Sequence, residues 1–267
     1  MKHINEYLSV KVKPTIIKAD NATFKKIIVS EVEHLGIDAD LNHIDVSKCT
    51  TLRMAFCDVF LYNNHFFGDV SKWNTENVKD FYYTFAYCDK FNGDLGEWDM
   101  SNTVSLDNMF YKCVSFEGNG LDQWDVHKVE RANSTFSGCY KFNGDLSKWN
   151  ISSLKEASYM FYHCLEFNCD LSKWDTTNLI HCNHMFIDCH KFKGDISTWK
   201  LNKLRNCEQM FAYSNYYKDL SSLYIPDDAF ILRMFADCTS LESNKNFWPE
   251  IIKRKYENEP KKIFNYY

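Results

Sequence analysis

A segment of about 25 residues recurs along most of this chain and constrains its fold more than any other feature. The motif FNGDLSKW at residues 142–149 returns as FNCDLSKW at residues 167–174 and as FNGDLGEW at residues 91–98. Self-similarity at a fixed period of roughly 20 to 50 residues is typical of repeat proteins, in which each unit packs only against its neighbours. The sequence therefore predicts a stack of similar units.

Three residue types keep this period together. A Phe lies 12 residues after each Trp, and a Cys lies three residues after most of these Phe residues. The three series are Trp73, Trp98, Trp124, Trp149, Trp174 and Trp199; Phe85, Phe110, Phe136, Phe161, Phe186 and Phe211; and Cys88, Cys113, Cys139, Cys164 and Cys189. The same spacing assigns Tyr224 to the next position in the Trp series. With imperfect copies at both ends, we count about eight units.

Within one unit, the apolar residues follow the leucine-rich-repeat pattern. Leu146, Trp149, Ile151 and Leu154 match L-x-x-L-x-L, with Trp in place of one Leu. Trp149 and Ile151 should point inward from a short strand, because strand side chains alternate. Residues 154–164 carry apolar side chains on one helical face, which predicts a helical turn. The predicted fold class is an α/β repeat solenoid, leucine-rich-repeat-like, with short parallel strands, helical turns and caps at both ends.

Caps are expected because an end unit of a solenoid cannot leave its apolar face bare. At the N-terminus, residues 6–18 alternate like a strand, and a helix follows with Asp20 at its start and Gly36 as its stop. At the C-terminus, residues 244–255 are compatible with a short helix. The predicted division is an N-terminal cap, a repeat solenoid, and a C-terminal cap with a basic tail: residues 1–39, 40–238 and 239–267.

The motif F-N-x-D-L-S-x-W, followed by M-F-x-x-C, resembles the BspA-type leucine-rich-repeat family. This family also occurs as a 25-residue repeat associated with mycoplasma surface lipoproteins, and in proteins of giant DNA viruses. The Gly-Asp-Leu-Ser turn, the Trp, the Met-Phe pair and the Cys carry the resemblance over about 200 residues. It implies a solenoid with a binding or adhesive role, without catalysis and without catalytic residues to assign. An intracellular or viral member is the closer comparison.

Charge and hydropathy limit the function classes. A formal net charge of −5 and a pI near 6.0 give no nucleic-acid footprint. The basic residues near the C-terminus, at 253–255 and 261–262, are interpreted as a solvated chain end. No apolar run approaches the roughly 18 residues of a membrane span, and the N-terminus lacks the apolar core of a signal peptide. We therefore expect an intracellular protein, in a host cell or virion if it is viral, with no nucleic-acid or membrane partner.

Two sets of residues resemble metal ligands. The densest local cluster consists of His181, Cys182, His184, Cys189 and His190. Zinc needs four converging ligands, whereas a Cys column on one inner face does not converge, so buried reduced thiols are preferred. The repeated Asp, as at Asp145 and Asp170, resembles a calcium ladder, but one carboxylate per unit more simply caps a turn. We expect no metal and no cofactor.

No nucleophile motif, phosphate loop or acid pair interrupts the repeat, so the chain is not expected to be an enzyme. We predict a non-catalytic scaffold that binds a protein partner along one extended face. If each Trp points inward, its flanking residues point outward. The predicted partner-binding residues are Lys72, Glu97, Asp99, Gln123, Asp125, His127, Lys148, Asn150, Lys173, Asp175 and Lys200, with the partner centred on Asp125, Lys148 and Lys173.

Two alternatives to this prediction stay open. The face can be merely solvated, with its Asn and Asp side chains only bracing the turns that follow them. The chain can also be a structural component of a virus particle or of a cell-surface layer.

Overall fold

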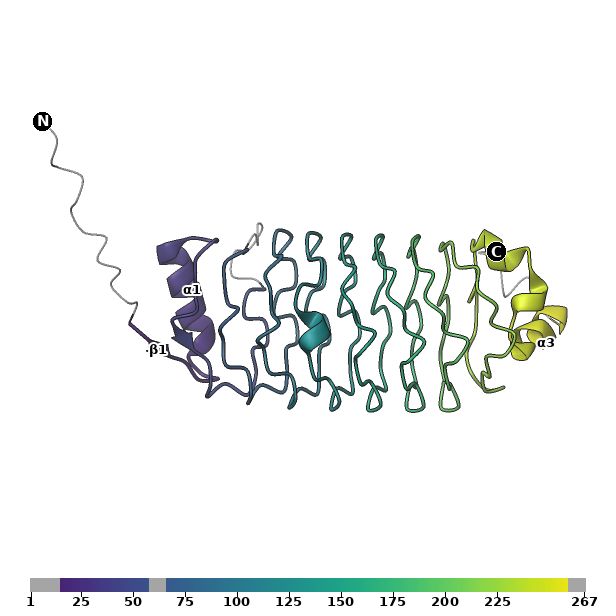
Figure 1. The fold of residues 1–267 in the computed structure, drawn as a ribbon, viewed down its shortest axis with the longest axis horizontal. Helices are drawn as coiled ribbons and strands as arrows, with labels where there is room; N and C mark the ends of the chain where they lie inside the picture. Colours follow the sequence, from purple (N-terminus) through teal and green to yellow (C-terminus); the bar gives the residue numbers. More distant parts are fainter. Residues whose placement is uncertain (1–14, 58–65, 259–267) are drawn as a thin grey trace, which may run out of the picture.

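The computed structural model describes residues 15–57 and 66–258. Figure 1 shows these residues as a long row of similar coils. Helix α1 (Phe24–Leu35) lies at one end of the row. The other end carries α2 (Thr239–Glu242), the 3₁₀ turn η2 (Lys245–Phe247) and α3 (Glu250–Asn258). Most of the strand predicted at residues 6–18 and the basic residues at 261–262 lie outside the described residues.

Adjacent coils are joined in register by single parallel bridges between equivalent residues. From Asp80 onwards, each bridge advances the chain by 24 to 26 residues, so one sequence repeat corresponds to one coil. We call the bridged residues the bridge column: Thr51, Asp80, Ser105, Arg131, Glu156, His181, Asn206 and Phe230.

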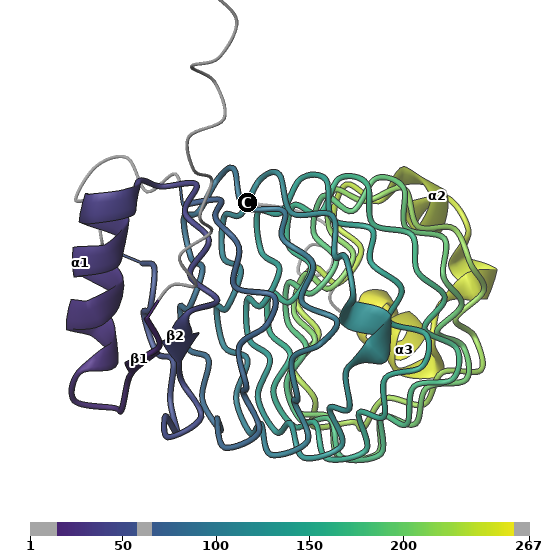
Figure 2. The same cartoon turned by 60° about the vertical axis from the view of Figure 1, so that its left-hand side comes forward.

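Within the described ranges, the two assigned strands both belong to the N-terminal end. Strand β1 (Ile17–Lys18) pairs in parallel with β2 (Ile44–Asp45), with Ile17 opposite Ile44 (Figure 2). The short strand expected at Trp149 and Ile151 is replaced by irregular backbone between two turns. There the Trp149 N–H donates to the Leu146 carbonyl at 3.1 Å, closing a turn within the coil. The parallel bridges between coils lie further along the unit, at the bridge column.

The helical turns expected after each Trp are also replaced by a different regular backbone. The Ala157, Tyr159 and Phe161 N–H groups donate to carbonyls of the next coil at 2.9 to 3.1 Å. The Met160 and Cys164 N–H groups instead donate to carbonyls three residues earlier in the same coil. Tight turns therefore alternate with bonds between coils. The apolar residues are spaced as in a helix because successive three-residue turns also place residues three and four apart on the same side of the coil.

Three columns of aromatic rings fill the interior. Trp124 lies nearly parallel to Trp149, with ring centroids 6.1 Å apart. Phe136 and Phe161 of the second column are 5.8 Å apart and 8° from parallel. The third column is made by the Phe of the F-N motif and its equivalents, which are Phe66, Phe91, Phe116, Phe142, Phe167, Phe192 and Tyr216. These side chains are almost completely buried, so the inward direction predicted for Trp is confirmed.

Polar atoms inside the stack find partners on the preceding coil. The Trp149 Nε1–H donates to the Leu121 carbonyl at 2.8 Å, and the Cys164 Sγ donates to the Phe136 carbonyl at 3.1 Å. Cys113, Cys139 and Cys189 make the same bond in their own coils. Burial raises the pKa of the Cys164 thiol well above its ordinary value. The Cys series therefore consists of buried free thiols, as expected.

The assignment of Tyr224 to the Trp series is wrong. Leu223 is buried at that position, while the Tyr224 side chain is 62% exposed. The Leu223 N–H donates to the Leu220 carbonyl, as the Trp199 N–H does to the Ile196 carbonyl. The step from Trp199 to Leu223 is one residue shorter than the usual 25, and spacing alone could not show where the deletion falls.

The described end elements cover the apolar faces of the first and last coils. Phe24, Ile28 and Val32 of α1 pack into the common core, and the helix ends before Gly36, whose φ is 105°. Leu35, in the last turn of α1, is 47% exposed. At the other end, Trp248 is fully buried.

Candidate binding surfaces

The residues predicted to bind a partner lie beside the buried tryptophans on successive coils. Ten of the eleven are exposed and His127 is half-buried. We call this surface the tryptophan-edge face, made of Lys72, Glu97, Asp99, Gln123, Asp125, His127, Lys148, Asn150, Lys173, Asp175 and Lys200. Because the coils stack in register, equivalent residues form columns that cross the coils.

The column that directly follows each Trp mainly holds its own backbone. The Asn150 Oδ1 accepts the Ser152 N–H at 3.1 Å, and the Asp175 Oδ1 accepts the Thr177 N–H at 3.1 Å. Asp99 and Asp125 cap their turns in the same way. The hydrogen bonds from Thr177 hold the pKa of Asp175 below its ordinary value. These side chains brace turns, as one of the alternatives anticipated.

The column that directly precedes each Trp has a different character. Lys72 pairs with Glu97 of the next coil, so their charges largely compensate each other. Lys148 and Lys173 occupy equivalent positions on adjacent coils and are both exposed. In the part of the chain that the structure describes, neither ammonium group forms an ion pair with a carboxylate. Two neighbouring cations are therefore presented to solvent near the middle of the stack.

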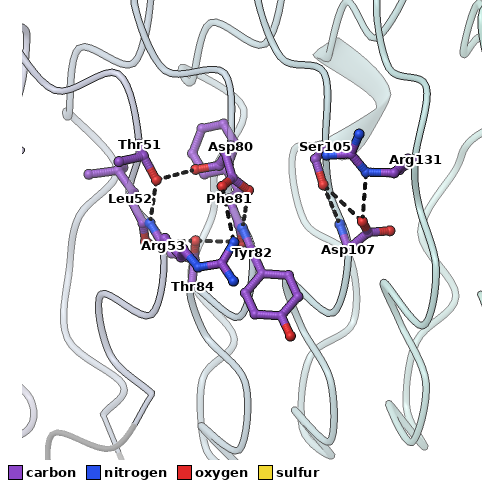
Figure 3. Close-up of polar contacts among 10 residues, drawn as sticks. All are labelled: Thr51, Leu52, Arg53, Asp80, Phe81, Tyr82, Thr84, Ser105, Asp107 and Arg131. Atoms are coloured by element: carbon purple, nitrogen blue, oxygen red, sulfur yellow. Dashed lines mark hydrogen bonds and ion pairs between the residues drawn. The ribbon is translucent and has the colours of Figure 1, made fainter.

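A second surface follows the bridge column, which is mostly half-buried, and polar side chains there link one coil to the next. Figure 3 shows Thr51 donating to the Asp80 carbonyl at 3.2 Å, and the Arg131 Nε–H bonding the Asp107 Oδ2 at 3.0 Å. Arg53 also approaches the Asp80 carboxylate, at 3.5 Å (Figure 3). The charged side chains drawn in Figure 3 thus form hydrogen bonds and ion pairs between adjacent coils.

Sequence reasoning missed the aromatic residues next to the bridge column. In most coils, two residues four apart have positive φ, as do Tyr83 and Tyr87 at 56° and 66°. Tyr87 is 45% exposed, and Tyr159 stacks on His184 with centroids 4.3 Å apart. We call the tyrosines of this surface the tyrosine face: Tyr82, Tyr83, Tyr87, Tyr111, Tyr159, Tyr162 and Tyr213. Gly138 occupies an equivalent position with positive φ. Because Gly favours this backbone conformation, Gly138 was the one residue in the sequence that indicated it.

The His and Cys residues that resemble a metal site in the sequence each contact a different partner in the structure. His181 contacts the Glu156 carboxylate at 3.0 Å, Cys182 faces the Met210 sulfur at 3.8 Å, and Cys189 donates to the Phe161 carbonyl. His184 stacks on Tyr159, and His190 faces Asp188 at 3.9 Å. Over residues 15–57 and 66–258, no group of three or more His, Cys, Asp or Glu side chains is arranged to hold a metal ion.

The repeated Asp residues cap turns, as the sequence suggested. The Asp145, Asp170 and Asp195 Oδ1 atoms accept the N–H groups of the Ser residues two positions later, at 2.8 to 3.0 Å. The hydrogen bonds from Ser147 lower the pKa of Asp145. Each carboxylate thus stabilises the turn that leads into the next Trp.

Comparison with known proteins gives one family. A family model described as "Mycoplasma protein of unknown function, DUF285" matches residues 24–120 and 105–224. The two matches together cover most of the chain and include the repeats from the first coil to Tyr224. No curated protein and no solved structure matches. No helix among the described residues has the length and apolar character needed to cross a membrane.

Proposed function

We propose that this chain, which belongs to the Mycoplasma protein family of unknown function DUF285, is a non-catalytic scaffold that binds a protein partner along the tryptophan-edge face. The partner contacts the column that precedes each Trp, centred on Lys148 and Lys173. It presents carboxylates to these two ammonium groups. The finer family assignment, to BspA-type leucine-rich repeats, is part of the same proposal.

The observation that supports this proposal most is the contrast between the two columns that flank the Trp. The column after the Trp is occupied with capping turns, as at Asn150 and Asp175. The exposed Lys148 and Lys173 have no such task and form no ion pair in the described residues, so two like charges on adjacent coils face solvent. Charges of this kind guide the encounter with an oppositely charged partner and fix its register.

The stack also supplies a rigid platform. Each coil is held to the next by main-chain hydrogen bonds, stacked rings and the Trp Nε1–H bonds. The side chains on its surface therefore keep fixed spacings, which lowers the entropy that binding costs. The covered ends of the row favour a scaffold over end-to-end growth into a particle or layer, the alternative considered from the sequence.

The test is affinity capture followed by mass spectrometry, comparing the wild-type chain with the double variant Lys148→Glu and Lys173→Glu. Both positions are exposed, so the thermal midpoint should change little. Capture of the partner should fall, and the dependence of the remaining binding on salt should shrink. The matched control is Lys191→Glu, an exposed Lys already paired with Glu166, and it should leave capture unchanged.

The tyrosine face provides the decisive comparison. Tyr is enriched at the centres of protein interfaces, so Tyr87→Ala with Tyr159→Ala is tested in parallel. If the Lys148 and Lys173 double variant retains full capture while the tyrosine variant loses it, the tyrosine face is the docking surface and the proposal for the tryptophan-edge face is refuted.

A further inference from the structure

One coil departs from the common pattern between Phe116 and Leu121. It has one residue more than the corresponding stretch of the preceding coil, from Phe91 to Leu95. The extra length is absorbed by Gly118 and Gly120, whose φ values are 95° and 81°. The 3₁₀ turn η1 (Leu121–Gln123) follows directly and is visible as the short teal coil in the middle of Figure 1.

This irregular segment contains one of three Asn-Gly sequences in the chain, at Asn92, Asn119 and Asn143. In an Asn-Gly pair, the backbone nitrogen of Gly can attack the side-chain carbonyl carbon of Asn, because Gly has no Cβ to hinder ring closure. The attack requires the Asn side chain to turn back towards its own backbone. The hydrogen bonds of each Asn side chain therefore decide how easily the reaction begins.

Two of the three side chains are tied to the next coil. The Asn92 Oδ1 accepts the Glu117 N–H at 2.9 Å, and the Asn143 Oδ1 accepts the Asn168 N–H at 2.9 Å. Both bonds hold the Asn side-chain oxygen against the backbone of the next coil. Each is an element of the regular contact between coils, so it must break before the ring can close.

The Asn119 side chain is held far less firmly. It is exposed, and its Nδ2 lies 3.3 Å from the Asn92 Oδ1 and 3.5 Å from the Asn92 carbonyl, which are long distances for hydrogen bonds. The backbone carbonyl of Asn119 accepts the Leu95 N–H at 3.4 Å, also a weak contact. The following Gly120 is essential, because a Cβ there would lie 2.3 Å from the Gly96 nitrogen.

We infer that Asn119 is a site of spontaneous covalent modification, in which the folded chain converts this asparagine to aspartate and isoaspartate. The Gly120 nitrogen loses its proton and bonds to the Asn119 Cγ, and the bond from Cγ to Nδ2 breaks, releasing ammonia. The resulting five-membered succinimide is opened by water. Addition at the side-chain carbonyl gives aspartate, and addition at the main-chain carbonyl gives isoaspartate. The net change consumes one water and releases one ammonia.

The modification changes the surface around it. Asn119 lines an open hollow together with Glu117, Asp122, Asp145 and Glu166, with Lys141 as the one cationic side chain among its lining residues. A new carboxylate adds negative charge to a surface that is already acidic. Isoaspartate also lengthens the main chain by one atom and displaces the carbonyl that accepts the Leu95 N–H. The chain thus acquires an age-dependent change of charge and shape in the coil that carries Trp124.

The test is incubation of the native full-length chain in mildly alkaline buffer, with samples digested and examined by mass spectrometry. Modification adds one mass unit, and an isoaspartate-specific methyltransferase labels the rearranged product. Asn119 should react roughly tenfold faster than Asn92 or Asn143, the factor that corresponds to one retained hydrogen bond of ordinary strength. In denaturant, the three rates should converge, because the neighbouring coils no longer hold the side chains.

Two variants control for the position of the reaction. Asn119→Gln should abolish the early ammonia release, because ring closure from the longer Gln side chain is much slower. Asn143→Gln should leave the early release unchanged. Equal rates at the three sites in the native chain would overturn the inference, and so would a native Asn119 that stays intact while the denatured chain reacts.

Discussion

Truncation of Trp149 to Ala tests how the interior is held together. The Trp149 side chain is 4% exposed, lies parallel to Trp124 and donates through Nε1 to the Leu121 carbonyl. About 200 Å² of buried ring at about 25 cal/mol per Å² corresponds to about 5 kcal/mol, an upper limit because unfolded chains already bury some surface. The Leu121 carbonyl also loses a buried partner, worth about 1 kcal/mol. Since the site relaxes in part, we expect a loss of about 3–5 kcal/mol.

The assay is equilibrium unfolding in urea, followed by circular dichroism. The matched control is Tyr224→Ala, which removes an aromatic side chain that the spacing assigns to the same series but that is 62% exposed. This control should change the free energy of unfolding by less than about 0.5 kcal/mol. A loss below about 1 kcal/mol for Trp149→Ala, or equal losses for the two variants, would refute the assignment of Trp149 to a continuous core column.

Three further outcomes follow from the same geometry. Cys113, Cys139, Cys164 and Cys189 should react with thiol reagents only as the chain unfolds, because burial raises the pKa of each thiol; rapid labelling in native buffer would contradict their burial. Gly118→Ala should destabilise more than Gly138→Ala, because the new Cβ would lie 2.7 Å from the Gly144 Cα in the first case and 3.2 Å from the flexible Lys112 side chain in the second; equal losses in urea unfolding would argue against this packing. The pKa values of Asp145 and Asp195 are lowered, chiefly by hydrogen bonds from Ser147 and from Ser197. Their contribution to stability is therefore present above the unfolded pKa of about 3.9 and is lost as pH falls through the lower folded pKa. Asp145→Asn with Asp195→Asn should flatten this acid slope, and an unchanged slope would contradict it.

The interior of the stack could be predicted from the sequence because large buried side chains must repeat at the period of the coil. The burial of Trp149, Phe161 and Cys164 follows from that period alone. The role of Asp145 as a turn cap follows from side-chain chemistry, since Asp readily accepts the N–H two residues later. Lys148 and Lys173 each directly precede a buried Trp. Because side chains of consecutive residues in extended backbone point to opposite sides, the burial of the Trp predicts that each Lys faces solvent.

The backbone between these positions could not be predicted in the same way. Residues 154–164 have the apolar spacing of a helix, yet their N–H groups alternate between their own coil and the next. The left-handed residues that allow this, such as Tyr159 and His163, have side chains that give no sequence signal for positive φ. The tyrosine face was missed for this reason. The shift from Tyr224 to Leu223 was missed because a one-residue deletion is invisible to spacing.

The register of the coils is the claim on which the binding surfaces depend, and paired cysteine substitutions test it most directly. Glu156 and His181 are bridged partners on adjacent coils. Because bridged residues lie within the Cα separation that a disulfide requires, Glu156→Cys with His181→Cys should cross-link under mild oxidation. Arg131→Cys with His181→Cys places the two thiols two coils apart and should stay reduced. Cross-linking of the first pair alone is the predicted result, and equal cross-linking of both pairs, or of neither, would contradict the stacked register.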